Sequence, residues 1–308
     1  MGDYISFDVG GSFIKYGVLK ENGQILFQDK APTNSHLGAQ ALLEQLYAIV
    51  DELAPRWNAS YISIATTGIV DIVSGTMQSG ISGWINGYEG LELKAAMERH
   101  SGLVTEVEND VNCVALAESW LGSAKGYRNI VCMTIGTGIG GALLIDGNLF
   151  HGNSNMAMEI GRMPIYPSTL EDLASVRAAV YEYAKLCNIP TTEVDGLLLA
   201  QREREGDPIA IRVFDNMCHY LAQGIASIVS TLTPDVLVLG GAIAADRDLI
   251  DGRLKKHLKA ILDLALFETI NLQYAKLENT AGLVGSIRHH QIMTRWRKLE
   301  EMNNDKAI

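Results

Sequence analysis

The sequence predicts an α/β protein of two domains, each built from a β-meander and helices. Three observations support this fold class. The chain has 308 residues, enough for two domains with separate cores. Two distant stretches share one layout: strand, glycine-rich turn with a hydroxyl, returning strand, then an Asx-Gly hairpin. Helical periodicity of apolar residues follows each of these stretches.

Composition narrows the class of function. Hydrophobic residues make up 47% and charged residues 20%, values typical of a globular protein without low-complexity tracts. The formal charge of -11 and the pI near 5.1 disfavour nucleic acid as a partner. The basic cluster at 288–298 is balanced by Glu300 and Glu301.

The sequence also indicates the cellular location and the state of the cysteines. No run of about 18 apolar residues and no signal peptide occurs, so the sequence predicts a cytoplasmic protein without a membrane partner. The four cysteines are widely spaced and form no C-x-x-C pair, which favours buried free thiols.

The first meander comprises strands at 4–9, 13–19 and 24–28, with a hairpin at Asn22-Gly23. The turn between the first two strands holds Asp8, Gly10, Gly11 and Ser12, with Lys15 nearby. Glycines let a phosphate approach the backbone, the hydroxyl adds a donor, and the carboxylate can hold Mg²⁺ or its water. A plain hairpin is the alternative interpretation of this turn.

A helix is predicted at 36–53, ended by Pro55, and a strand at 61–65. The loop at 66–71, which contains Gly68, directly follows this buried strand and is a candidate ligand loop or a plain turn. Residues 81–89 are rich in glycine and aromatic residues, which suits a sugar face, although a tryptophan is more often simply packed.

The central segment is Glu108-Asn109-Asp110, where a short strand runs into a helix at 111–121. A carboxylate there lies where open α/β folds place ligands, and the free N–H groups of a helix favour negative charge. Asp110 is therefore a candidate catalytic base. The alternative is that Asn109 and Asp110 only cap the helix, because both residue types are preferred at N-caps.

The second meander has strands at 129–135 and 142–145, joined by the turn Gly136-Thr137-Gly138-Ile139-Gly140-Gly141, and a hairpin at Asp146-Gly147. A strand pattern and not a helix follows this turn, so it is not a dinucleotide fingerprint. Glu159 to Arg162 then form a loop that carries both charges. Helices are predicted at 172–187, 207–232 and 247–264, and a buried strand at 234–241. Gly240 and Gly241 at its end leave room for a flat ring such as adenine.

Four segments together resemble the ROK family of bacterial sugar kinases and repressors, within the actin-like ATPase (ribonuclease H-like) fold. They are Asp8 to Ser12, Glu108 to Asn112, Gly136 to Gly141, and Glu159 to Gly161. The likeness runs from Asp8 to about Gly241. It implies a smaller N-terminal domain at 1–118 plus 287–308 and a larger C-terminal domain at 119–286, and it suggests a homodimer.

The resemblance also implies roles for individual residues. Asp110 is expected to take the proton from a sugar hydroxyl, O6 above all, and Asp8 to organise Mg²⁺. ATP is expected to be the cofactor, with its phosphates bound by Gly10, Gly11, Ser12, Lys15, Thr137 and Gly138 and its adenosine against Gly240 and Gly241. The sugar is expected to contact Gly68, Asn109, Asp110, Glu159, Arg162 and Glu171.

This chain departs from the family pattern at Arg162. The family usually has a histidine there, which contacts the sugar and binds a structural zinc, followed by a cysteine-rich zinc motif. Residues 163–170 contain no cysteine, so no zinc site is expected. Arg162 either forms an ion pair with a neighbouring carboxylate or leaves space for a glycosidic substituent. The second pattern resembles the zinc-less β-glucoside kinases.

The leading hypothesis is an ATP-dependent sugar 6-kinase, with a glucokinase or an N-acylmannosamine kinase as alternatives within the class. A sugar-responsive repressor would need an N-terminal DNA-binding domain of about 60 to 80 residues. The first phosphate turn begins at Asp8, which disfavours that class. A non-catalytic assembly or sensor protein is disfavoured by the presence of Asp110.

Overall fold

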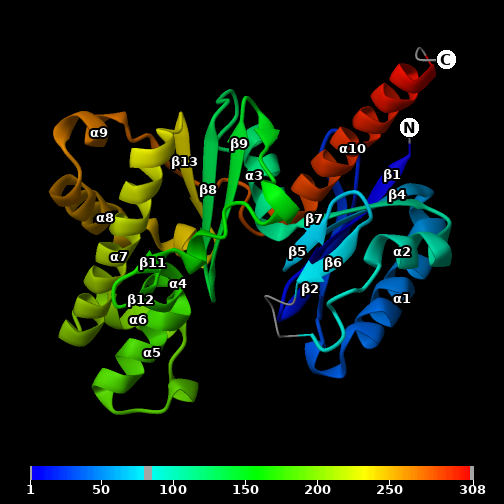
Figure 1. Ribbon diagram of the computed structural model, residues 1–308. Coiled ribbons are helices and arrows are strands. Elements are labelled where there is room, and N and C mark those ends of the chain that lie inside the picture. Colours follow the sequence, from blue (N-terminus) through cyan, green and yellow to red (C-terminus); the bar gives the residue numbers. More distant parts are fainter. Residues whose placement is uncertain (1, 80–84, 306–308) are drawn as a thin grey trace. The chain divides into compact units, whose positions relative to one another are not determined.

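The computed structural model describes residues 2–79 and 85–305, and these form two compact units (Figure 1). Unit 1 comprises Met1–Leu121, His151–Met156 and Asn279–Ile308, and unit 2 comprises Gly122–Phe150 and Ala157–Glu278. The predicted domain boundaries stay a prediction. Residues 81–84 of the predicted aromatic loop lie outside the described part of the chain.

Unit 1 is organised around a five-stranded sheet in the order β3-β2-β1-β4-β7. The first three strands pair antiparallel, as the predicted meander requires, and β4 and β7 extend the sheet parallel to β1. The strands are β1 (Asp3–Val9), β2 (Phe13–Leu19), β3 (Ile25–Pro32), β4 (Ala59–Thr66) and β7 (Val104–Asn109).

Alternation along β1 explains how helices cover both faces of this sheet. Ile5 and Phe7 are fully buried in a core that includes residues of α1 (Ala39–Trp57) and α2 (Leu93–Ser101). Each such side chain contributes about 1.5–3 kcal/mol by leaving water. Ser6 points to the opposite face, where its hydroxyl donates to the Leu283 carbonyl of α10 (Ala281–Asp305) at 2.9 Å. Helix α3 (Asp110–Trp120) packs against α10.

Unit 2 repeats this topology in a second five-stranded sheet, β10-β9-β8-β13-β14. Strands β8, β9 and β10 form an antiparallel meander, and β13 and β14 continue parallel to β8. The predicted duplication is therefore confirmed. The strands are β8 (Ile130–Ile135), β9 (Ile139–Ile145), β10 (Asn148–Leu149), β13 (Val236–Gly240) and β14 (Leu272–Tyr274).

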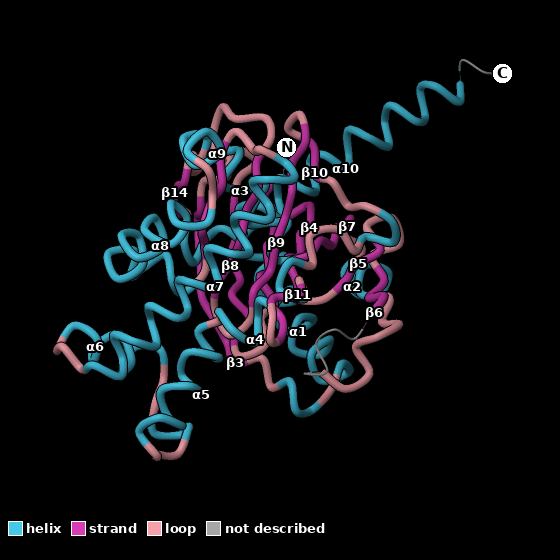
Figure 2. Tube along the Cα trace, turned by 60° about the vertical axis from the view of Figure 1, so that its left-hand side comes forward, coloured by secondary structure: helices cyan, strands magenta, loops and turns pink. Residues whose placement is uncertain are grey.

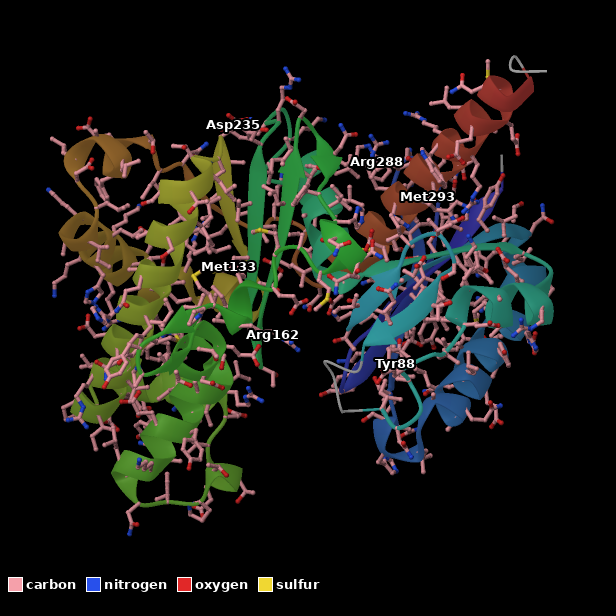
Figure 3. The ribbon with its side chains drawn as sticks, in the orientation of Figure 1. Tyr88, Met133, Arg162, Asp235, Arg288 and Met293 are labelled. Atoms are coloured by element: carbon pink, nitrogen blue, oxygen red, sulfur yellow. The ribbon has the colours of Figure 1, made fainter. Side chains whose placement is uncertain are left out.

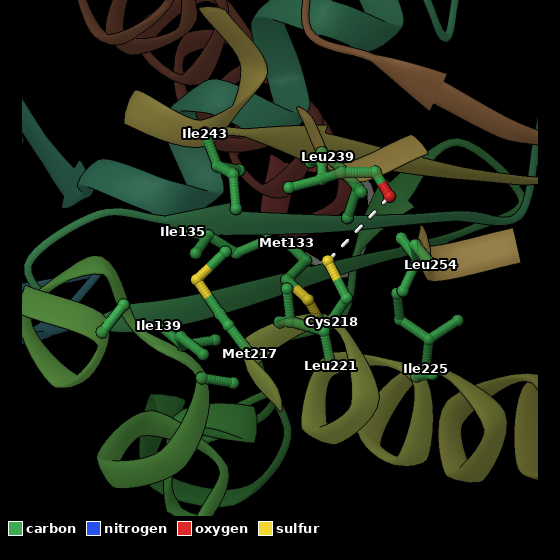
Figure 4. Close-up of a cluster of buried hydrophobic side chains, with 14 of the residues drawn as sticks. Met133, Ile135, Ile139, Met217, Cys218, Leu221, Ile225, Leu239, Ile243 and Leu254 are labelled. Atoms are coloured by element: carbon green, nitrogen blue, oxygen red, sulfur yellow. Dashed lines mark hydrogen bonds between the residues drawn. The ribbon is translucent and has the colours of Figure 1, made fainter. Parts of the chain in front are cut away.

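The helices of unit 2 enclose a second core. Helices α7 and α8 lie side by side along one face of this sheet (Figure 2). Met133 and Leu239 of the sheet pack there against Met217 and Leu221 of α7 (Figure 4). The helices are α4 (Leu170–Ala174), α5 (Val176–Cys187), α6 (Gly196–Arg204), α7 (Pro208–Leu232), α8 (Arg247–Ile261) and α9 (Leu264–Thr269).

Short elements complete the described chain. Two small hairpins are formed by β5 (Ile69–Asp71) with β6 (Thr76–Ser79) and by β11 (Pro164–Ile165) with β12 (Ser168–Thr169). No described helix is long and apolar enough to cross a membrane.

Several predicted helix limits are wrong. Helix α1 runs through Pro55 to Trp57, because a proline in the last turn removes a single N–H and Asn58 then ends the helix at φ 49°. The predicted helix at 172–187 is two helices, since Ser175 is extended and caps α5 through its hydroxyl. The predicted helix at 247–264 ends at Ile261, and α6 was not predicted.

Candidate active site

The first glycine-rich turn joins β1 to β2 in unit 1. Gly11 and Ser12 are exposed at its tip. The Gly10 N–H donates to the Phe13 carbonyl at 3.0 Å, and the Thr33 hydroxyl donates to the Gly10 carbonyl at 2.7 Å. The turn is thus fixed at its base and open at its tip, as a phosphate-binding turn requires.

Asp8 lies beside this turn, at the end of β1. It pairs in register with Lys15 of β2, whose Nζ is 3.1 Å from Asp8 Oδ2. The backbone of α10 approaches from the other side, because a Cβ added to Gly282 would lie 2.6 Å from Asp8 Cγ. The structure therefore brings Asp8, Lys15 and the Gly10–Ser12 turn together in unit 1.

The segment before α3 lies at the end of β7. Asn109 is the N-cap, and its Oδ1 accepts from the Val111 N–H at 2.9 Å and the Asn112 N–H at 3.1 Å. Its Nδ2 donates to the Gly68 carbonyl at 3.0 Å. Asn109 therefore caps the helix, as predicted, and also ties the 66–71 loop to the start of α3. Its amide has a second N–H with which it could contact a ligand.

Asp110 is the first residue of α3 and is partly buried. Its Oδ1 accepts from the Val111 N–H at 2.9 Å. The phenol of Tyr88 (Figure 3) is buried and hydrogen-bonded to Thr66, and the pKa of Tyr88 is raised by burial, with the Asp110 charge adding to the effect. Asp110 thus lies at a helix N-terminus, which favours its ionised form, and only an ionised carboxylate can accept a proton.

Behind Asp110 lies a buried carboxylate, Glu108, which is 1% exposed. Glu108 Oε2 is 2.7 Å from His151 Nε2 and 3.3 Å from His289 Nδ1. Burial raises the pKa of Glu108, but the two histidines and a hydrogen bond from Asn112 outweigh it and hold that pKa below its usual value. Burying a charged carboxylate costs free energy unless it is paired, and such groups are frequent at functional sites, so Glu108 is itself a candidate site residue.

The second glycine-rich turn joins β8 to β9 in unit 2 and is close to Glu171. Glu171 Oε2 accepts from the Ile139 N–H at 2.8 Å, and a Cβ added to Gly138 would lie 2.5 Å from the same oxygen. Gly161 reaches the turn as well, since its Cβ would lie 2.2 Å from the Ile139 carbonyl. Within unit 2 the structure thus assembles Thr137, Gly138, Gly161 and Glu171.

Glu159 and Arg162 form an ion pair on the adjoining loop. Arg162 Nε is 3.6 Å from Glu159 Oε2, and the Arg162 side chain (Figure 3) is 55% exposed. Burial raises the pKa of Glu159, Arg162 lowers it, and the charge of Glu171 raises it further. The ion pair considered in the first interpretation of Arg162 therefore exists, but an exposed pair of this kind adds about 0–1 kcal/mol to stability.

Gly240 ends β13, Gly241 follows it, and the next two residues line an apolar cavity of about 380 Å³. Gly241 has φ +80°, and a Cβ there would lie 2.5 Å from the Ile135 carbonyl, so only glycine fits. The cavity is lined by Thr137 of the second glycine-rich turn, by Val180 and Phe214, and by Ala242 and Ile243 directly after Gly241. Its size and lining suit a flat apolar ring with polar groups at its rim.

Comparison with known proteins decides the family. The ROK family model matches residues 4–290 of this chain. The chain belongs to the ROK family. A β-glucoside kinase of Listeria innocua is 30% identical over 92% of this chain and 96% of its own length.

Solved ROK structures share the fold. A candidate N-acetylmannosamine kinase of Listeria monocytogenes has a TM-score of 0.85 at 26% identity, covering 95% of this chain and 99% of that one. The ROK glucokinase of Streptomyces griseus, solved with glucose and AMPPNP, has a TM-score of 0.80 at 25% identity, covering 93% and 98%. The predicted α/β actin-like ATPase fold and the resemblance to ROK sugar kinases are confirmed.

The sequence of this ROK protein predicts no role for Glu108, His151 or His289. Glu108 belongs to the segment Glu108 to Asn112, and a carboxylate on the buried side of a predicted strand indicates a buried charge that needs a partner. The two histidines lie far along the chain from Glu108, so a single sequence gives no reason to pair them.

Proposed function

We propose that the protein is an ATP-dependent sugar kinase that transfers the γ-phosphate to the 6-hydroxyl of a hexose or β-glucoside. The observation that carries the proposal is the position of Asp110 at the first turn of α3, in a chain matched by the ROK family over residues 4–290. The named relatives are sugar kinases, and one was solved with glucose and an ATP analogue.

Asp110 acts in this proposal as the general base. Its carboxylate accepts the O6 proton while the bond from O6 to the γ-phosphorus forms and the bond from that phosphorus to the β-γ bridging oxygen breaks, releasing ADP. Phosphoryl transfer needs little covalent help, so positioning and one proton acceptor are what the protein supplies. Asn109 and Gly68 hold the carboxylate-bearing turn in place.

The unit 2 residues fit a nucleotide. The cavity beside Gly241 is large enough for an adenine ring, and a side chain at Gly241 would collide with the Ile135 carbonyl. The turn residues Thr137, which is exposed, and Gly138, which is half-buried, are proposed to bind phosphate oxygens, as are Gly10 to Ser12 in unit 1.

Asp8 fits a magnesium ion held through water. Mg²⁺ commonly takes one or two carboxylates and completes its octahedron with water and substrate phosphates. Asp8 offers one carboxylate beside an exposed phosphate-type turn. Lys15, whose Nζ lies 3.1 Å from Asp8 Oδ2, is proposed to bind phosphate as well. When bound, the ion would neutralise phosphate charge. Magnesium, a homodimer and a cytoplasmic location stay predictions.

The substrate is proposed to be a β-glucoside because Arg162 replaces the family histidine. We expect kcat/KM for cellobiose or gentiobiose to exceed that for glucose, and the variant Arg162→His to shift the ratio towards glucose by about 10-fold. Equal or better kcat/KM for free glucose in the wild type would contradict the glycoside assignment. A preference for an acylated amino sugar would instead favour the N-acylmannosamine kinase alternative.

A further inference from the structure

The buried carboxylate of Glu108 binds both sides of the turn that carries Asp110, the segment from Asn109 to Asn112. Glu108 Oε1 accepts from the Asn109 backbone N–H at 2.7 Å and from Asn112 Nδ2 at 3.0 Å. These two donors lie on either side of Asp110 in the chain. Any shift of Glu108 therefore moves both anchors of the turn that carries Asp110.

The other oxygen of Glu108 reaches two distant segments. His289 belongs to the buried first half of α10, and His151 opens the segment His151–Met156. The chain enters unit 1 from unit 2 at His151 and returns to unit 2 at Ala157, two residues before Glu159. His151 is thus the point at which this excursion is fastened to Glu108, with its side chain 19% exposed.

The charges in this cluster can be assigned from hydrogen bonding. His289 Nε2 is buried and has no hydrogen-bond partner among the described residues, so a proton there would be unsatisfied. The neutral ring with its proton on Nδ1 fits, and burial lowers the pKa of His289 accordingly. His151 then balances Glu108: burial disfavours its charge, but the Glu108 hydrogen bond and charge outweigh burial and raise the pKa of His151.

The neighbouring buried carboxylate has cationic partners of its own. Glu106, also buried, pairs with Lys94 of α2 at 3.2 Å and with Arg297 of α10. The charges of Glu106 and Lys94 act on His289 in opposite directions. His151 is therefore the residue of this cluster that carries the positive charge opposite Glu108, 2.7 Å from its Oε2.

We infer that Glu108 and His151 are positioning residues for Asp110, with His151 acting as a latch that fastens the 151–156 segment onto the Asp110 loop. The inference rests on the proposed kinase function. Glu108 fixes Asn109 and Asn112, and His151 fixes Glu108. Without the contact from His151 the Asp110 carboxylate is still present, but the turn that carries it can move. The misplacement lowers kcat more than it changes KM for the sugar.

If His151 holds the Asp110 turn in this way, kcat should decrease on the alkaline side of its pH profile. The folded-state pKa of His151 is raised above 6.5, so the charged pair is complete below pH 6.5 and is lost as pH rises through the folded pKa. Asp110 acts as base only when ionised and gives a limb on the acid side instead. The two limbs are therefore distinguishable in one profile.

The test compares His151→Ala, His151→Gln and the control His100→Gln. His100 forms a similar pair with Asp51 at 2.8 Å. It lies at the C-terminal end of α2, and the full length of β7, about 20 Å, separates it from Asp110 along the chain. We expect His151→Ala to lower kcat by about 10- to 100-fold with KM changed by less than about 3-fold. His151→Gln, which keeps a donor, is expected to recover most of kcat without the alkaline limb. His100→Gln is expected to behave as wild type.

Amide hydrogen exchange gives a readout that needs no activity. We expect the Asn109 N–H to exchange at least about 10-fold faster in His151→Ala than in wild type or in His100→Gln. An unchanged Asn109 exchange rate, or an equal kcat loss in His100→Gln, would overturn the latch. A wild-type protein that releases no ADP with any sugar would defeat the proposed function, while the exchange experiment would still decide whether His151 holds the Asp110 turn.

Discussion

Asn109 and Asp110 divide two roles that a sequence pattern cannot separate. Either residue type can cap a helix, and the structure gives the cap to Asn109, whose Oδ1 accepts from two backbone N–H groups of α3. Asp110 follows as the first helical residue and accepts one. Capping is therefore the role of Asn109, and the carboxylate of Asp110 follows it in the first turn of the helix, where negative charge is favoured.

Replacement of Asp110 by asparagine tests its role as base. Asp110→Asn keeps an oxygen that can accept from the Val111 N–H, so we expect the fold to be retained. Because a positioned base contributes about 10²–10⁴-fold, kcat should fall by that factor while KM for the sugar changes little. Steady-state ADP release measures this. The control is Asp263→Asn, the same change at the exposed N-cap of α9, which should keep kcat within about 2-fold.

The sequence predicts the candidate site residues better than it predicts the buried residues that hold them in position. Asp8, Gly138 and Asp110 stand at strand ends, and local patterns predict strand ends well. Glu108, by contrast, depends on His151 and His289, which meet it only through the tertiary fold. Contacts at such separation leave no periodic trace in one sequence. The roles of the site residues stay predictions.

At the scale of elements, α10 and α3 pack closely against each other in unit 1. A Cβ added to Gly285 of α10 would lie 1.8 Å from the Cys113 carbonyl of α3. The helix backbones therefore approach closely at Gly285, and this contact holds α3, with Asp110 at its start, against α10. Glycine is needed here for close packing and not for its backbone freedom.

Gly285→Ala should therefore destabilise unit 1 by about 2–3 kcal/mol, because the added methyl group cannot fit without moving one helix. Gly252→Ala is the matched control, since no atom lies within 4 Å of its added Cβ and alanine favours the interior of α8 by about 1 kcal/mol. Urea denaturation measures both changes. Equal stabilities for the two variants would contradict the close packing of α10 on α3.

Element limits show where local sequence rules lose to context. The extended Ser175 splits one predicted helix because its hydroxyl accepts from the Ala178 N–H and starts a new one. Helix α6 has a weak apolar face and begins at a glycine, so periodicity did not reveal it. The two meanders were predicted because turn chemistry and strand alternation agree at both of them.

At the scale of the whole molecule, acid pH should act on unit 1 through its buried histidines. Burial lowers the pKa of His290 to about 4 from 6.5. The folded state then binds fewer protons between these values, so this contribution is complete above pH 6.5 and lost as pH falls towards 4. The difference amounts to about 3 kcal/mol. The pKa of Glu108 is lowered from 4.5 in the folded state, so its contribution to the free energy of unfolding is lost as pH falls below 4.5.

Tryptophan fluorescence can follow this loss in unit 1 alone. Three of the four tryptophans of the chain, Trp57, Trp120 and Trp296, lie within the described residues, and all three belong to unit 1. We expect the urea midpoint by fluorescence to decrease from pH 7 to pH 4.5, and to decrease less in His290→Gln. A midpoint that is independent of pH in the wild type would contradict the assignment of neutral buried histidines.

The central claim is sugar phosphorylation by a ROK protein that uses Asp110. The most direct measurement is a coupled ADP-release assay with ATP across hexoses, acylated amino sugars and β-glucosides, run in parallel on wild type and Asp110→Asn. We expect turnover with at least one sugar, highest for a β-glucoside, and a decrease in kcat of about 10²–10⁴-fold in Asp110→Asn. Absence of ADP release with every sugar, or undiminished turnover in Asp110→Asn, would contradict it.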